Sequence, residues 1–453
     1  MHERRYFGTD GIRDVANRGK LTTESLLRIG HAIGKVVADR VGKDARGKAL
    51  IVRDTRVSGP MISGVLTAAL MAHGIDCYCC GVLPTPAASL IVRRRGMDLS
   101  IVVSASHNPM EDNGIKMFGP DGRKLTDEME FEIEQWIERP LAQDVDVVGN
   151  DVGRLYPFNV GGDFYMDTMI NEFFPHMDLT GKKIVIDCAN GSGCRVAPRI
   201  LGALGAEVIA INDQDDGSRI NVEAGVGHAD LAAARVVEEG ADLGIVLDGD
   251  ADRVLLVDEN GSVKDGDAIL NALASTLPEG VPRLVVATVM SNLGLDVALK
   301  EHGVEVVRVG VGDRYVAEGM REHGAVIGGE QSGHIIFCEK DGWFGDGLYT
   351  ALRVLGAVED AGPISTLLGR MERFPQVLKN VAVRGKPPIS EQAELQEAIR
   401  LAQVQLGESG RVLVRYSGTE LLIRIMVEGP DKDEIGQIAD GLSAILRNSI
   451  GVD

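Results

Sequence analysis

The sequence lacks two features that would place it outside the cell or in a membrane. It has six cysteines in 453 residues, which is too few for the dense disulfide framework of small secreted proteins. Its start, MHERRYFGTDGIR, has no apolar core of a signal peptide, and no apolar run elsewhere approaches the ~18 residues of a membrane helix. We therefore expect reduced thiols, no membrane contact and a cytoplasmic location.

Positive charge is also in short supply. Lys and Arg number 47 against 67 for Asp and Glu, which gives a formal net charge of -20. A surface of this sign repels nucleic acid and anionic membranes. We expect no nucleic-acid partner, and we expect any anionic ligand to be bound by a local group of Arg and Lys.

The composition is that of a folded protein with more than one domain. Hydrophobic residues make up 44% and charged residues 25%, which is ordinary for globular proteins and excludes a disordered chain. At roughly 100 to 200 residues per domain, this length predicts two to four domains.

A pair of apolar stretches recurs three times along the chain. In each pair, the first stretch runs into a small polar turn that can start a helix, and the second ends in a polar loop. The first members are residues 49–59, 183–193 and 284–294, and the second members are residues 99–109, 241–253 and 325–334. Their alternation with helical segments predicts βαβ units and largely parallel sheets. Because ligands bind beyond the carboxyl ends of such strands, loops from three similar domains can face one cleft.

After residue 370 the pattern changes. A strand-like stretch and a Pro pair precede a helical segment, and the strands of RVLVRYSGTELLIRIMVEG follow. We therefore expect an α/β protein of four domains around a central cleft. The expected domains are three related α/β domains with mixed sheets, at 1–150, 151–257 and 258–370, and a smaller C-terminal α+β domain at 371–453.

The stretch DGDADRV places carboxylates at every second position, at Asp248, Asp250 and Asp252. An EF-hand would need Gly at the sixth position, where Arg253 stands, and it would not continue into the apolar VLLV. A solvated strand edge would not hold like charges this close behind an apolar strand without a counter-ion. The stretch therefore favours a divalent-cation site, with Mg²⁺ as the preferred ion and a phosphate oxygen as a further ligand.

The loop SASHNP follows the second apolar strand of the first domain. Ser106 in this loop is either a capping serine in a turn, which the loop alone favours, or a nucleophile aimed at a ligand. Lys116 lies a few residues later, as either a surface lysine or a charge and proton donor at the same site.

Two further loops suit a phosphorylated sugar. GGEQSGH offers a carboxylate, an amide and a hydroxyl between glycines, a mixture that suits sugar hydroxyls but is weak evidence alone. RYSGTELLIR places Ser417 and Thr419 around a Gly turn between Arg415 and Arg424. Such a turn favours a phosphate nest over an Arg-rich exposed hairpin. Together the four loops indicate phosphoryl transfer on a sugar phosphate.

At this point the sequence resembles the α-D-phosphohexomutase superfamily over essentially its whole length. The motifs that carry the resemblance occur in the superfamily's order: FGTDGIR (7–13), RDTRVSG (53–59), SASHNP (104–109), DGDADRV (248–254), ATVMSNLGLD (287–296), VGDRYV (311–316), GGEQSGH (328–334) and RYSGTE (415–420). GTDGIR, MSNLGLD and EQSGH are more similar to its glucosamine branch than to its glucose and mannose branch.

The resemblance implies a role for each loop. It implies a phosphoserine at Ser106 and one Mg²⁺ ion held by that phosphate with the three aspartates. The other catalytic residues that it implies are Arg13 at the transferred group, Lys116 in proton transfer, Arg253 against the phosphoserine and His107 beside it. The substrate-binding residues that it implies are Glu330 and Ser332 for sugar hydroxyls and, for the second phosphate, Arg415, Ser417, Gly418, Thr419 and Arg424.

The implied reaction interconverts glucosamine 6-phosphate and glucosamine 1-phosphate through a 1,6-bisphosphate, feeding the synthesis of UDP-N-acetylglucosamine. Glucosamine or glucose 1,6-bisphosphate is the expected activator, and the expected assembly is a monomer or a homodimer. A glucose or mannose phosphomutase of the same superfamily and a non-catalytic sugar-phosphate sensor are the alternatives. A metal-dependent phosphatase is disfavoured because no water-activating partner for Ser106 is evident in the sequence.

Overall fold

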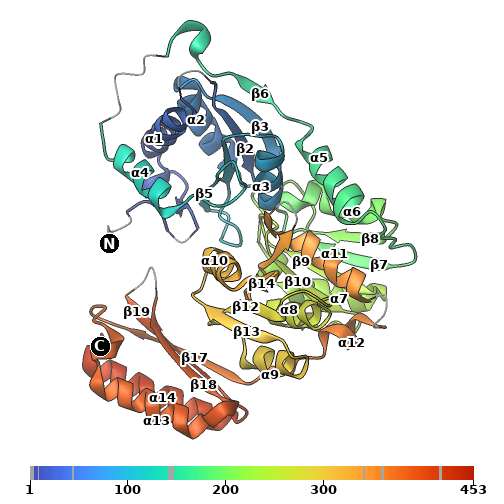
Figure 1. Ribbon diagram of the computed structural model, residues 1–453, viewed down its shortest axis with the longest axis vertical. Coiled ribbons are helices and arrows are strands. Elements are labelled where there is room, and N and C mark those ends of the chain that lie inside the picture. The colour runs from blue at the N-terminus through green and yellow to red at the C-terminus, as the bar shows by residue number, and fades with distance from the viewer. Residues whose placement is uncertain are drawn as a thin grey trace. The chain divides into compact units, whose positions relative to one another are not determined.

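The computed structural model describes residues 5–8, 10–42, 45–140, 147–339, 342–358, 362–417 and 421–452. The chain forms two compact units. Unit 1 comprises Met1–Met290 and Val306–Arg370, and unit 2 comprises Ser291–Glu305 and Met371–Asp453. Three mixed sheets belong to unit 1, and a three-stranded sheet belongs to unit 2 (Figure 1).

The first sheet has the strand order β1-β5-β4-β2-β3-β6. Its strands are β1 (Ile12–Val15), β2 (Lys48–Arg53), β3 (Asp76–Val82), β4 (Leu99–Val103), β5 (Asp112–Phe118) and β6 (Leu155–Pro157), and its helices are α1 (Thr23–Val41), α2 (Gly59–Ala72), α3 (Thr85–Arg94) and α4 (Asp127–Ile137). Helices α1, α2 and α4 share a core with one face of this sheet, and α3 contacts β2 and β4 as well. Every residue of β4 is buried, as expected for a strand that is covered on both faces.

The second sheet has the order β11-β10-β9-β7-β8. Its strands are β7 (Lys183–Asp187), β8 (Glu207–Ile211), β9 (Leu243–Leu247), β10 (Val254–Asp258) and β11 (Val263–Lys264), and the helices of this part of the chain are α5 (Gly161–Asp167), α6 (Ala197–Ala203) and α7 (Ala229–Glu239). The apolar positions of α7 and of the sheet form one core cluster. Helix α7 ends at Gly240, whose left-handed backbone (φ 59°) is the usual glycine C-cap.

The third sheet has the order β13-β12-β14-β15-β16. Its strands are β12 (Leu284–Thr288), β13 (Glu305–Val309), β14 (Ile327–Gly329), β15 (Ile335–Glu339) and β16 (Gly342–Gly345), and the helices are α8 (Gly266–Ser275), α10 (Asp313–His323), α11 (Gly347–Val358) and α12 (Ile364–Leu368). Apolar residues of α10 lie against those of β12 and β15 in a core of their own.

The three sheets share one construction, which positions the loops singled out above. In each, a central strand pairs in parallel with its neighbour, as β2 does with β4, β7 with β9 and β12 with β14. The next strand then returns antiparallel, as β5 does beside β4, β10 beside β9 and β15 beside β14. The loops at 104–111, 248–253 and 330–334 connect these antiparallel pairs, so all three occupy equivalent places.

Unit 2 contains a three-stranded antiparallel sheet, and two of its helices share a core with one sheet face. Its sheet order is β17-β19-β18, with β17 (Gln376–Ala382), β18 (Arg411–Tyr416) and β19 (Leu422–Glu428), and its helices are α9 (Leu293–Glu301), α13 (Ala393–Leu406) and α14 (Lys432–Ile450). Alternate residues of β19, Ile423, Ile425 and Val427, are buried with the apolar residues of α13 and α14. The expected fold class is confirmed: three related α/β domains with mixed sheets are followed by a smaller α+β domain.

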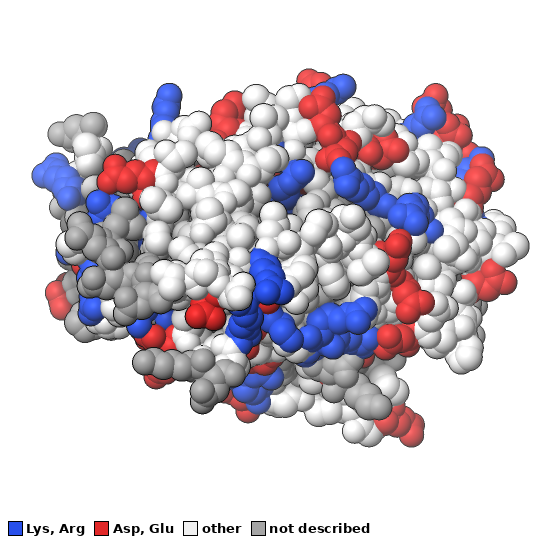
Figure 2. All heavy atoms as spheres, turned by 90° about the horizontal axis from the view of Figure 1, so that it is seen from above, with Lys and Arg blue, Asp and Glu red and all other residues white. Residues whose placement is uncertain are grey.

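Charged side chains of both signs lie on the surface. On the face shown in Figure 2, several basic side chains lie close together near the centre, acidic side chains lie mostly around them, and most of the visible atoms belong to neither class. Within the described ranges, the structure contains no helix with both the length and the apolarity that a bilayer crossing requires. An anion must therefore be bound by particular basic side chains rather than by a general surface field.

Candidate active site

Ser106 lies directly after β4 with its side chain aimed at a carboxylate. Its Oγ donates a hydrogen bond to Asp248 Oδ2 at 2.5 Å and lies 3.4 Å from His107 Nδ1. The residue is 1% exposed and has a left-handed backbone with φ 55°. A residue other than glycine adopts this conformation at a cost, so the surrounding structure must hold it there.

The three aspartates of DGDADRV form a buried acidic cluster in the loop between β9 and β10. Ligand oxygens of Asp248, Asp250 and Asp252 all lie within 4.8 Å of one another. Burial and the charges of Asp252 and Asp250 raise the pKa of Asp248 well above its ordinary value. Within the described residues, no hydrogen-bond donor reaches Asp250 Oδ1, although this atom is buried. Buried carboxylate oxygens without donors fit a hard divalent cation.

Lys116 on β5 is the cation nearest to this cluster. Its Nζ lies 2.7 Å from Asp250 Oδ2, 3.2 Å from Asp252 Oδ2 and 3.1 Å from Asp10 Oδ2. The residue is 2% exposed, so it is not the surface lysine considered as an alternative. Burial alone would lower the pKa of Lys116, but the three carboxylates outweigh burial and raise it well above its ordinary value. Lys116 is therefore a buried ammonium ion.

Two arginines flank the serine loop and the acidic cluster. Arg13 Nη1 lies 3.5 Å from the carbonyl oxygen of Ala105, and the side chain forms an ion pair with Asp10. Arg253 donates its backbone N–H to Asp248 Oδ1 at 3.2 Å, and its Nε lies 3.9 Å from Asp252 Oδ1. Burial alone would lower the pKa of Arg253, but the neighbouring carboxylates raise it above its ordinary value. Both cations lie where they can offset charge on a phosphoryl group.

The third loop lies against the acidic cluster. Glu330 Oε1 accepts the backbone N–H of Gly312 at 3.0 Å, and Ser332 is exposed. A β-carbon on Gly333 would come within 2.2 Å of the carbonyl oxygen of Val254, so only glycine allows this approach of the two loops. His334 Nδ1 lies 3.6 Å from Asp252 Oδ1. Burial opposes the charged ring, but Asp252 and the other acids nearby raise the pKa of His334 to about 9.

A cavity of about 510 Å³ opens beside part of this cluster. Lys116, Asp252 and His334 contribute to its lining, together with side chains of α10 and β16. Its volume lies within the range of small-molecule sites. The acidic loop and the third loop thus each contribute a residue to a space that is large enough for a ligand.

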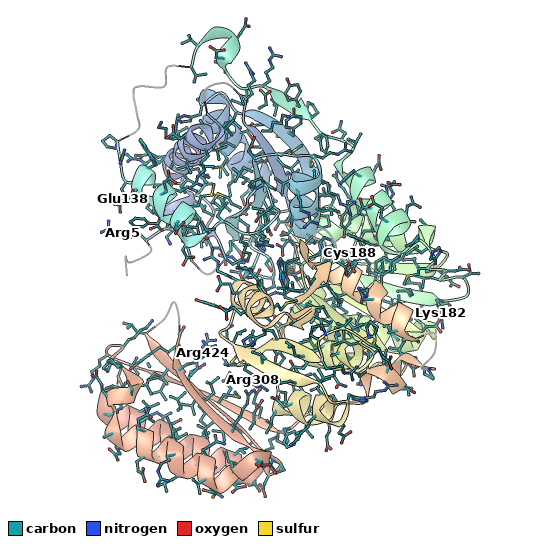
Figure 3. All side chains as sticks on the ribbon, viewed as in Figure 1. Arg5, Glu138, Lys182, Cys188, Arg308 and Arg424 are labelled. Atoms are coloured by element: carbon teal, nitrogen blue, oxygen red, sulfur yellow. The ribbon has the colours of Figure 1, made fainter. Side chains whose placement is uncertain are left out.

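The residues expected to bind the second phosphate lie in unit 2. Arg415 of β18 stands directly opposite Arg424 of β19 in an antiparallel pair, so the two side chains share a sheet face. Figure 3 labels Arg424 on this sheet. Burial and the charge of Arg424 lower the pKa of Arg415. Ser417 follows β18, and its carbonyl oxygen accepts Lys386 Nζ at 2.7 Å. The pair thus places two positive charges on one face of this sheet. Gly418 and Thr419 lie outside the described residues.

Sequence reasoning missed several charged residues at the site. Asp10 lies between Lys116, Lys124 and Arg13, which together hold its pKa well below its ordinary value although burial would raise it. Lys124 also reaches Asp313 at the start of α10, with 2.6 Å between Nζ and Oδ2. The signal was available for Asp10, which belongs to GTDGIR, and for His334, which belongs to EQSGH. Lys386 and Lys124 stand outside any motif.

Comparisons with known proteins cover the whole chain. Four family models of phosphoglucomutase/phosphomannomutase match successive parts of the chain. They are alpha/beta/alpha domain I at residues 4–144, domain II at 163–261, domain III at 265–374 and the C-terminal domain at 378–445. The phosphoglucosamine mutase of Desulforamulus reducens is 48% identical over 446 residues, which is 98% of this chain and 99% of that protein. The phosphoglucosamine mutase of Parvibaculum lavamentivorans is 44% identical over 453 residues, again 98% of this chain and 99% of that protein.

Solved structures show the same arrangement of elements. A phosphoglucomutase/phosphomannomutase family protein from Burkholderia thailandensis aligns with a TM-score of 0.79 and 25% identity, covering 98% of this chain and 99% of that one. The N-acetylphosphoglucosamine mutase of Aspergillus fumigatus, solved with GlcNAc-6P and magnesium, aligns with a TM-score of 0.68 and 18% identity, covering 98% and 96% of the two chains. At that identity the second likeness concerns the fold alone.

Proposed function

The chain belongs to the phosphoglucomutase/phosphomannomutase family, and from this premise we propose that it acts as a phosphoglucosamine mutase. It interconverts glucosamine 6-phosphate and glucosamine 1-phosphate through phospho-Ser106 and a 1,6-bisphosphate. Full-length relatives that are 44% and 48% identical and carry this name support the substrate. The observation that carries the chemistry is the Ser106 hydroxyl, which lies 2.5 Å from one carboxylate of a buried acidic cluster.

In the forward half-reaction, the hydroxyl at carbon 1 of the sugar bonds to phosphorus as the bond from phosphorus to Ser106 Oγ breaks. The sugar hydroxyl releases a proton, and the serine oxygen takes one up. After the bisphosphate turns over, the phosphoryl group at carbon 6 passes back to Ser106 by the same steps in reverse. A trace of glucosamine or glucose 1,6-bisphosphate primes the serine.

The chain's own residues orient and neutralise the moving group. Arg13 and Arg253 flank the serine loop and the acidic cluster and offset charge on the phosphoryl oxygens. We assign Lys116, a buried ammonium ion, to proton donation toward the leaving serine oxygen, and His107 to a position beside it. Glu330 and Ser332 bind sugar hydroxyls.

The acidic cluster is proposed to hold Mg²⁺ through Asp248, Asp250 and Asp252, with an oxygen of phospho-Ser106 as a further ligand. When bound, the ion would neutralise charge on the phosphoryl oxygens. The buried Oδ1 of Asp250, which no described donor reaches, supports this assignment. The hairpin with Arg415, Ser417 and Arg424 is proposed to bind the phosphate that is not being transferred, together with Gly418 and Thr419.

The cysteines support a reducing compartment. All six are free, and burial raises the pKa of the Cys80 thiol to about 12. A thiol that stays protonated is a poor nucleophile for disulfide exchange. We propose that the enzyme works in the cytoplasm, where its product feeds UDP-N-acetylglucosamine synthesis.

The test is conversion of glucosamine 6-phosphate, with Mg²⁺ and a trace of glucose 1,6-bisphosphate, beside glucose 6-phosphate at equal concentration. Faster turnover of the amino sugar supports the proposal. Faster turnover of glucose 6-phosphate keeps the mechanism and refutes the substrate. Binding of both sugars without turnover of either refutes the enzyme and favours a sensor.

A further inference from the structure

Ser106 belongs to a closed ring of hydrogen bonds that contains none of the other residues assigned above. The backbone N–H of Ser106 donates to Ser104 Oγ at 3.0 Å, and Ser104 Oγ donates to Asp54 Oδ2 at 2.6 Å. The Nε of Arg56 donates to the same Asp54 oxygen at 2.9 Å, and its Nη2 donates to the carbonyl oxygen of Ser106 at 3.0 Å. The ring therefore holds both the N–H and the C=O of the nucleophilic residue.

Arg56 fastens the rest of the same loop. Its Nη2 also donates to the carbonyl oxygen of Asn108 at 2.8 Å, and its Nη1 donates to the carbonyl oxygens of Asp112, at 2.9 Å, and Pro109. The side chain is 0% exposed, so all of its donors are used inside the protein. The ion pair of Arg56 with Asp54 is buried, and a buried ion pair is weak evidence for added stability, because removing both charges from water is costly. The contacts of Arg56 fix the path of the loop from Ser106 to Asp112.

A second support comes from the next domain. Asn221, in the segment before α7, donates its side-chain N–H₂ to the carbonyl oxygen of Ser106 at 2.8 Å and to that of Asn108 at 3.0 Å. Its own backbone is left-handed, with φ 59°, a conformation that asparagine tolerates better than most residues. A β-carbon on Gly249 would come within 2.5 Å of the same Ser106 oxygen. That carbonyl group is thus fixed from both domains.

These contacts account for the backbone conformation of Ser106. A left-handed serine persists only where its surroundings determine it. If the backbone returned to an ordinary conformation, the direction of the Cα–Cβ bond would change and Oγ would leave Asp248. In-line phosphoryl transfer depends on alignment, and small displacements of the reacting atom are costly.

We propose that Asp54, Arg56, Ser104 and Asn221 are positioning residues that hold Ser106 in the geometry required for phosphoryl transfer. They act through the main chain of Ser106, so they affect the transfer step and leave the binding of the sugar unaffected. This inference rests on the proposed function.

The first test replaces the ring's hydroxyl, because removing the Arg56 guanidinium would leave a buried carboxylate unpaired. Ser104→Ala should lower kcat for glucosamine 6-phosphate roughly 10- to 100-fold and leave KM nearly unchanged. Ser100→Ala is the matched control: Ser100 is also a fully buried serine, in β4 four residues before Ser104, and no hydrogen-bond partner reaches its Oγ within the described residues. This variant should behave as wild type. A Ser104→Ala enzyme with the kcat of wild type overturns the proposal. A variant whose only change is a raised KM overturns it as well.

The second test uses the support from the neighbouring domain. Asn221→Gly keeps the left-handed backbone and removes both side-chain hydrogen bonds, so kcat should again fall while KM stays constant. Asn17→Gly is its control, because Asn17 also has a positive φ, 64°, and no side-chain hydrogen bond to the described residues is seen. An unchanged kcat in Asn221→Gly refutes the role of Asn221.

Hydrogen exchange separates this inference from the proposed function, because it needs no turnover. Amides of residues 104–112 should exchange faster in Ser104→Ala and Asn221→Gly than in wild type or in either control. If wild type lacks mutase activity but the two variants still exchange faster than wild type in this loop, the proposed function fails while the ring still holds the loop. If wild type is active and exchange in this loop is unchanged in both variants, the positioning role fails while the function stands.

Discussion

The reaction passes through a single oxygen atom, so the sharpest prediction concerns one residue. Ser106→Ala should lose turnover by roughly 10³-fold or more, because the nucleophile cannot be replaced by a neighbour. It should also lose the phosphate of about 80 Da that wild type acquires from glucose 1,6-bisphosphate. Intact-protein mass spectrometry measures the second effect independently of turnover. Phosphate incorporated into the variant at the wild-type level would show that another residue carries the group.

The cation site gives a second prediction for a single residue. Asp250→Asn removes one charge from the cluster, and its Oδ1 is one of the buried oxygens that no described donor reaches. The affinity for Mg²⁺ should fall by roughly tenfold or more, since ligand charge sets the strength of such sites. Calorimetric titration with Mg²⁺ measures this without substrate. The thermal stabilisation that Mg²⁺ gives to wild type should shrink in parallel, and unaltered affinity would place the ion elsewhere.

The sequence predicts part of the site at this scale. The three aspartates and Ser106 stand in short polar motifs directly after apolar strands, so they are visible without a structure. The roles of Arg56 and Asn221 are not visible: Arg56 lies in the motif RDTRVSG, which gives no reason to place it at the serine, and Asn221 lies in no motif. Their distance from Ser106 along the chain, 50 and 115 residues, leaves no local pattern to read. Only the fold brings them together.

At the scale of elements, the sequence predicted where the strands lie better than it predicted how neighbouring strands pair. Apolar runs ending in polar loops predicted β4, β9 and β14, together with the loops after them. The expectation of largely parallel sheets was only partly right, because β5, β10 and β15 return antiparallel. An apolar period marks burial and does not reveal the direction of the neighbouring strand. The domain boundaries at 150, 257 and 370 stay predictions.

The carboxyl group of Asp346, just before helix α11, predicts that the stability of the fold depends on pH. Asp346 stands before α11, where its Oδ1 accepts the N–H of Tyr349 at 2.9 Å and its Oδ2 accepts the hydroxyl of Tyr165 at 2.6 Å. Burial raises the pKa of this carboxyl from 3.8 to about 6 despite these hydrogen bonds. The folded protein therefore binds this proton more tightly than the unfolded chain. Below pH ~4 this proton binding adds about 3 kcal/mol to the free energy of unfolding. This contribution is lost as the pH rises through about 6.

Asp346→Asn should remove this dependence, because the amide has a similar shape and carries no charge. The melting temperature of the variant relative to wild type should rise between pH 4 and pH 7 and then level off. Tyr165→Phe is the companion variant: loss of the hydroxyl removes a bond that favours the ionised carboxyl, so the transition should move to higher pH. Parallel melting curves for Asp346→Asn and wild type over this range would contradict the assignment.

For the whole molecule, the question is how a chain with a net charge of -20 binds an anionic sugar phosphate. The positive charge that we propose for this purpose is divided between the two units. Arg13, Lys116 and Arg253 belong to unit 1, and Arg415 and Arg424 belong to unit 2. Under the proposed mechanism, the first group acts on the phosphate in transfer and the second on the phosphate at rest. The two groups should therefore affect different kinetic constants.

Arg424→Gln tests this division. The resting phosphate is bound equally in the ground state and the transition state, so KM for glucosamine 6-phosphate should rise roughly 10- to 100-fold while kcat changes much less. The affinity for Mg²⁺, a property of unit 1, should stay at the wild-type value. Lys379→Gln is the matched control, because it removes the same charge from β17 of the same sheet, where Lys379 pairs with Asp440. If both variants raise KM equally, the effect belongs to general charge and not to the pair of arginines.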